Sequence, residues 1–157
     1  MSTAIHTLHV VLAGVWLGGV LFTTLVVSPA LKAMKWAEAE RVSVRSKIGE
    51  HYARVGGVNL VLLALFAILD GLTAGFDVAF YAEYALLVAL LGLVMAHGAY
   101  LGRRLTQLAE AEKRAGSEEE AHTFAEKRSD LQKLSLRVSW ADILVSVVVA
   151  VLAVNAS

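Results

Sequence analysis

The chain has 157 residues, of which 57% are hydrophobic and only 18% are charged, and its mean hydropathy is +0.64. Soluble domains have about a quarter charged residues, so this composition excludes an ordinary soluble domain and predicts one membrane domain over residues 1–157. The formal net charge of zero gives no indication of nucleic-acid binding, and the lack of cysteine excludes disulfides and thiolate metal sites.

Four apolar segments follow one another along the chain, at residues 3–31, 55–72, 78–101 and 136–154. Each is long enough to cross a bilayer as a helix, which takes ~20 apolar residues. The first lacks the positively charged start of a signal peptide and is too long for one, so we predict a retained span. The sequence therefore predicts an all-α integral membrane fold, a four-transmembrane-helix bundle.

The positive charges predict the orientation of the bundle. All 14 lysines and arginines fall within residues 32–54 and 103–137. Because Lys and Arg near membrane spans are retained on the cytoplasmic side, the links 32–54 and 102–135 are predicted to be cytoplasmic. The short link between the second and third spans has neither residue and is predicted to be external, as are both termini. The expected location is a cell membrane of the bacterial inner-membrane type, crossed several times.

The long link 102–135 is predicted to form a helical hairpin that extends the third and fourth spans into the cytoplasm. Gly116 separates its two arms. Ser117 and Glu120 have the spacing of a capping box, which predicts that the second arm begins there. In the first span, Pro29 predicts a kink near the cytoplasmic end.

Polar side chains inside a span are costly, so they are the first candidates for function. His6 and His9 share one face of the first span, at its external end. Asp70 ends the second span and Glu83 lies near the start of the third, at a similar depth. Imidazole and carboxylate groups bind transition metals, so these four residues are the predicted metal ligands.

A second polar layer is predicted nearer the cytoplasm. His97, Asp142 and Asn59 lie at similar depths on three different spans, which indicates either a structural ion pair or a polar relay. Haem b in a helix bundle needs axial ligands, and His9, His97 and His51 are the candidates for that role. Ser146 belongs with Asp142 to a polar stripe on the fourth span that is predicted to face the bundle interior.

The segment LHVVLAGVWLGGVLFTTLVVSPAL, Leu8 to Leu31, resembles the first span of copper-resistance protein D-like membrane domains. The shared pattern is His9, the W-L-G-G that begins at Trp16, and the small-Pro-apolar stretch around Pro29. The resemblance implies a four-helix domain with a role in copper handling. The spacing of His9 and Trp16 is also similar to that in HemJ-type protoporphyrinogen oxidases, which implies that His9 is a haem ligand.

Three hypotheses of function follow. The first is a protein that binds or transports a transition metal, copper above all, or haem. The second is a membrane redox enzyme or electron carrier that contains haem b, and the third is a structural or assembly subunit without a small ligand. The expected partners are the lipid bilayer, a second copy of the chain and a cytoplasmic protein at the hairpin, with no nucleic acid.

Overall fold

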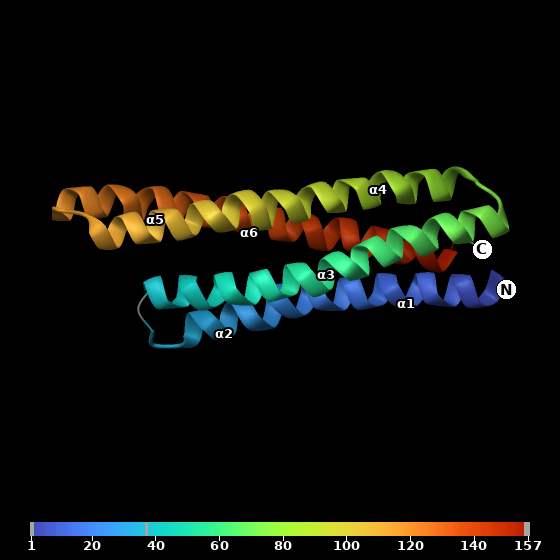
Figure 1. The fold of residues 1–157 in the computed structure, drawn as a ribbon, viewed down its shortest axis with the longest axis horizontal. Helices are drawn as coiled ribbons and strands as arrows, with labels where there is room; N and C mark the ends of the chain where they lie inside the picture. Colours follow the sequence, from blue (N-terminus) through green and yellow to red (C-terminus); the bar gives the residue numbers. More distant parts are fainter. Residues whose placement is uncertain (1, 37, 156–157) are drawn as a thin grey trace.

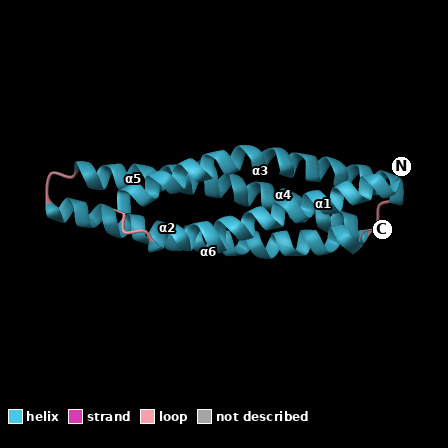
Figure 2. Ribbon diagram, turned by 90° about the horizontal axis from the view of Figure 1, so that it is seen from below, coloured by secondary structure: helices cyan, strands magenta, loops and turns pink. Residues whose placement is uncertain are grey.

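A computed structural model describes residues 2–36 and 38–155, and within them every regular element is a helix. The elements are α1 (Ser2–Leu21), the π-helical turn η1 (Phe22–Val27), α2 (Ser28–Ala33), α3 (Glu38–Ala74), α4 (Val78–Met95), the π-helical turn η2 (Ala96–Gly102), α5 (Arg103–Arg114) and α6 (Glu118–Asn155). Figure 2 shows helices joined by short connections and no strand in this part of the chain. The predicted all-α fold is confirmed.

The elements form long rods that lie side by side (Figure 1). Within the described residues, four continuous helical segments are long and apolar enough to cross a membrane: Thr3–Ala33, Glu40–Ala74, Val78–Arg114 and Glu118–Asn155. Both ends of the described chain lie at one end of the bundle, beside the connection between α3 and α4 (Figure 1). The protein is therefore a multi-pass membrane protein.

At the opposite end, α5 and the start of α6 project beyond α2 and α3 as a helical hairpin (Figure 1). Leu105, Leu108 and Ala109 on α5 are buried, and α5 packs mainly against α6. Arg128 Nε on α6 donates a hydrogen bond of 2.8 Å to Glu112 Oε2 on α5. The predicted hairpin is thus present, and it is held by both apolar packing and a partly buried ion pair.

The start of α6 contains the predicted capping box. The backbone N–H of Glu120 donates to Ser117 Oγ at 3.2 Å, so the serine caps the helix as expected. Glu120 Oε2 accepts a hydrogen bond of 3.0 Å from the N–H of Gly116. In the usual capping box the carboxylate binds the N–H of the capping residue itself, so here it reaches one residue further back.

A π-helical turn, rather than a simple kink, precedes Pro29 in the first rod. The proline lies in the first turn of α2, and η1 comes directly before it. Proline has no N–H to donate and its ring crowds the preceding turn, and a wider π-helical turn accommodates both effects. The helix then ends at Ala33, where Met34 adopts an extended backbone.

The core is a narrow column of side chains along the bundle axis, while many large apolar residues such as Val55 and Val78 point outward, as expected of helices in lipid. Trp16 on α1 and Leu63 on α3 lie in this column. At the end of the column near the α3–α4 connection, a Cβ added to Gly71 would lie 2.5 Å from the Tyr84 hydroxyl oxygen. Glycine at position 71 therefore permits the close approach of α3 and α4 beside Asp70.

Candidate metal centre

The four residues predicted as metal ligands lie at the end of the bundle that holds both ends of the described chain. His6 and His9 are on the first turns of α1, Asp70 is near the end of α3, and Glu83 is near the start of α4. His9, Asp70 and Glu83 are buried, and the side chain of His6 is 27% exposed. Three helices thus bring together residues that are up to 77 positions apart in the sequence.

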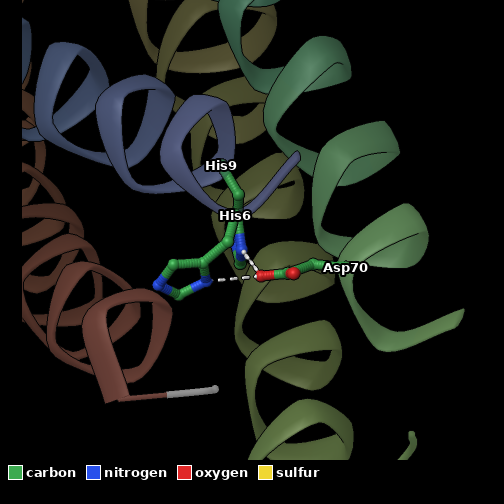
Figure 3. A group of neighbouring side chains, drawn as sticks. All are labelled: His6, His9 and Asp70. Atoms are coloured by element: carbon green, nitrogen blue, oxygen red, sulfur yellow. Dashed lines mark hydrogen bonds and ion pairs between the residues drawn. The ribbon is translucent and has the colours of Figure 1, made fainter. Parts of the chain in front are cut away.

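Both histidines of α1 point at one carboxylate oxygen of Asp70 (Figure 3). His6 Nδ1 lies 2.8 Å from Asp70 Oδ2, and His9 Nδ1 lies 3.2 Å from the same atom. One potential ligand atom from each of the three residues lies within 4.8 Å of the other two. Two imidazole nitrogens and one carboxylate oxygen therefore converge on a single point.

Glu83 occupies a different position from that of a fourth ligand in this group. Its Oε1 lies 2.8 Å from His9 Nε2, the ring nitrogen that Asp70 does not contact. Both side chains are fully buried. Histidines that ligate a metal commonly donate their second ring N–H to a carboxylate, which fixes the orientation of the ring. Glu83 has this geometry toward His9.

The turn between α3 and α4 keeps the two carboxylates close together. Gly75 has a φ of 98°, in the left-handed region that glycine adopts without strain. Asp77 then caps α4, because its Oδ1 accepts a hydrogen bond of 3.1 Å from the N–H of Phe80. Tyr84 donates from its hydroxyl to the carbonyl of Ala67 at 3.0 Å, which ties the two helices together below the turn.

The two ring nitrogens of His9 cannot both donate hydrogen bonds to the carboxylates when the ring is neutral. A neutral imidazole has a single N–H, yet both nitrogens of His9 face carboxylate oxygens. The second contact therefore needs a further proton, on the ring or on the carboxylate that faces it, or a metal ion on Nδ1. A divalent cation between neutral imidazoles would balance the charges of two ionised carboxylates.

A comparison with protein families places the chain. The model of a family described as a domain of unknown function, DUF4149, matches residues 11–114, which is more than half of the chain. The chain belongs to the DUF4149 family. No curated protein and no solved structure matches it. The DUF4149 match includes Asp70 and Glu83, whereas His6 and His9 precede its first residue and Asp142 follows its last.

The residues of the predicted second polar layer are less closely joined than the four of the metal centre. Asn59 Nδ2 donates to the carbonyl of Leu12 at 3.1 Å. Within the described residues, no hydrogen bond links His97, Asp142 and Asn59 to one another, and Asp142 Oδ1 is buried without a hydrogen-bond partner. His51, the other haem candidate, is exposed, and its Nδ1 donates to the carbonyl of Lys47 at 3.0 Å.

One buried contact below the cluster was not predicted as a pair. Trp16 Nε1 donates a hydrogen bond of 2.9 Å to Ser146 Oγ, and both side chains are buried. Trp16 lies two helical turns after His9 on α1, about 10 Å further from the end of the bundle that holds the metal centre. The seven-residue spacing of His9 and Trp16, together with the polar stripe that contains Ser146, was the signal available in the sequence.

Proposed function

We propose that the protein binds one divalent transition-metal ion at the end of its helix bundle. His6 Nδ1, His9 Nδ1 and a carboxylate oxygen of Asp70 are the ligand atoms, and Glu83 orients the ring of His9. The observation that carries the proposal is the convergence of two imidazole nitrogens on one oxygen of a buried carboxylate. These atoms are close enough for a single ion to replace the hydrogen bonds between them.

Copper(II) is the ion that we expect to bind most tightly. Imidazole ligands suit copper and zinc, and copper(II) has the highest affinity among the divalent first-row metals. The chain has no cysteine, and its three methionines, Met1, Met34 and Met95, provide no thioether ladder for copper(I). The resemblance of Leu8–Leu31 to copper-resistance protein D-like domains supports the same choice.

Three protein ligands leave at least one coordination position free, which is the arrangement of exchangeable and catalytic sites rather than closed structural ones. The side chain of His6 is the most exposed of the three, and its 27% exposure gives the ion a route from the end of the bundle. We therefore propose a site that takes up and releases metal at one membrane surface.

The first experiment is an absorption spectrum of the purified full-length protein, because haem b is the competing ligand. Both nitrogens of His9 face carboxylate oxygens. A free metal ion can take His9 and Asp70 as neighbouring ligands, whereas a haem iron has only one axial position on the side that faces His9. We expect no Soret band. A Soret band that His9→Ala removes would contradict the metal proposal and would favour the likeness to HemJ-type oxidases.

Glu83→Gln tests the orienting role of Glu83. The amide keeps the shape of the side chain but replaces the ionised acceptor, and loss of such a partner typically weakens metal binding by about 10- to 100-fold. We expect a fall of this size in copper affinity, measured by calorimetric titration in detergent. The matched control is Glu126→Gln, which alters an exposed His–Glu pair in the hairpin, with His122 Nδ1 at 3.7 Å from Glu126 Oε1. Equal affinity in the wild type and Glu83→Gln would remove Glu83 from the site.

We also propose that the hairpin is cytoplasmic and the metal site external, as the distribution of Lys and Arg indicates. Because the chain has no cysteine, Ser117→Cys introduces a single labelling site at the tip of the hairpin. In sealed, right-side-out vesicles, a membrane-impermeant maleimide should label it only after the membrane is opened. Labelling of intact vesicles would reverse the orientation.

A further inference from the structure

A groove runs between the first and second rods at the end of the bundle opposite the metal centre. Its volume is ≈ 500 Å³, and its lining includes Phe22 and Val27 from η1 and Lys47, Ile48, His51 and Val55 from α3. The groove belongs to neither the metal centre nor the inner polar layer. Its position and lining therefore require a separate explanation.

The chemistry of the groove changes along its length. Val55 and Phe22 are large, exposed apolar side chains, and Val55 is the first residue of the predicted span. His51 lies one turn further toward the charged part of α3, and Lys47 lies two turns away, about 12 Å from Val55 along the helix. An apolar surface thus leads into a cationic rim at the boundary between the predicted second span and the charged part of α3.

The positive charge of the rim comes from the ammonium group of Lys47. Lys47 is exposed, and its ammonium group has no hydrogen-bond or ion-pair partner among the described residues. The Nδ1–H of His51 donates to the carbonyl of Lys47, so Nε2 can donate to a phosphate only when the ring is protonated, and Lys47 supplies the permanent charge of the rim. The π-helical turn η1 contributes the facing wall, and such turns are frequent at functional sites.

We propose that this groove binds an anionic phospholipid. The phosphate of the headgroup lies against Lys47 and His51, and one acyl chain runs along Phe22, Val27 and Val55. A basic pocket between transmembrane helices at the cytoplasmic surface is a known arrangement for anionic headgroups. A partner helix of another protein would match the apolar half of the groove, but it would need a carboxylate beside Lys47 to match the cationic rim.

Native mass spectrometry of the full-length protein tests the proposal. The protein is titrated with phosphatidylglycerol and, separately, with phosphatidylcholine of the same acyl chains. We expect one phosphatidylglycerol to bind in preference to phosphatidylcholine, and Lys47→Ala to weaken its binding by about fivefold. Lys133→Ala is the matched control, because Lys133 is exposed in the hairpin and pairs with Asp130 at 2.9 Å. It removes the same charge away from the groove.

Two results would overturn the proposal: equal binding of the two lipids by the wild type, or an equal loss of phosphatidylglycerol in Lys47→Ala and Lys133→Ala. The comparison of lipids uses the unaltered protein, so it holds even if a variant folds poorly. The groove is remote from His9, so copper affinity should be unchanged in Lys47→Ala. Failure of the metal proposal and failure of the lipid proposal are therefore distinguishable.

Discussion

Replacing His9 with alanine should weaken copper(II) binding by about 100-fold or more, measured by calorimetric titration of the full-length protein in detergent. Loss of an outer-shell partner already costs about 10- to 100-fold, and His9 is proposed as a direct ligand. The substitution also leaves Glu83 buried without its one described hydrogen-bond partner and removes one of the two contacts to Asp70. His9 takes part in two of the three hydrogen bonds described in the cluster, as does Asp70.

The control is His122→Ala, the same substitution at an exposed position of the hairpin. It should bind copper as the wild type does, because His122 is remote from the cluster. A His9→Ala protein that binds copper as tightly as the His122→Ala protein would show that the metal binds elsewhere. Circular dichroism of both variants verifies that they remain helical.

Trp16→Ala should lower the free energy of unfolding by about 3–5 kcal/mol, the usual cost of removing a large aromatic side chain from a core. Trp16 is only 3% exposed and packs in the middle of the buried column. Its loss leaves a cavity and deprives Ser146 Oγ of the donor at 2.9 Å. Thermal unfolding in detergent, followed by circular dichroism, should show a midpoint lower by roughly 6–20 °C.

Two variants separate the causes of this loss. Trp16→Phe keeps most of the ring but cannot donate a hydrogen bond, so it should cost about 1 kcal/mol from that bond. Trp140→Ala removes the same side chain from a site where it is 49% exposed, and its midpoint should be close to that of the wild type. Equal effects of Trp16→Ala and Trp140→Ala would contradict the assignment of Trp16 to the core.

The hydrogen bond between Trp16 and Ser146 also helps to decide whether the protein only binds a metal ion or transports it across the membrane. Along the bundle axis, the pair lies between His9 and Asp142. The helix α6 runs toward the metal centre, and Asp142 comes one turn before Ser146 on it. An ion path along the bundle axis from His9 to Asp142 would meet this buried contact. For this reason we propose reversible binding at one surface, with the inner carboxylate outside the metal path.

Most of the fold was predictable from the sequence, because the signals are local. Apolar length gives the spans, and glycine with a capping box gives the tip of the hairpin at Gly116 and Ser117. The ends of the helices were harder to predict. The helix α3 begins at Glu38, inside the charged link, because the Glu, Lys and Arg residues of that link have high helix propensity although they lie outside the predicted apolar span. The π-helical turn before Pro29 depends on how the backbone relieves strain, which composition does not reveal.

The candidate site was predicted in part, for a physical reason. Depth within the membrane can be counted along each span, and it placed His6, His9, Asp70 and Glu83 in one layer. Which faces meet depends on the rotation of each helix about its axis, and this is decided by packing. Depth alone could not therefore assign Glu83 to the second nitrogen of His9.

The same reasoning applies to the inner layer. His97, Asp142 and Asn59 lie at similar depths, yet no described hydrogen bond joins them. Equal depth is a necessary condition for contact between spans but not a sufficient one. Their function as a relay stays a prediction.

The most direct test of the metal centre is the electron paramagnetic resonance spectrum of the protein with one equivalent of copper(II). The account predicts a single copper species whose hyperfine pattern contains two imidazole nitrogens, and His6→Ala should reduce this number to one. A spectrum identical to that of copper in the same detergent buffer, or one that His6→Ala leaves unchanged, would contradict the proposal that His6, His9 and Asp70 hold the ion.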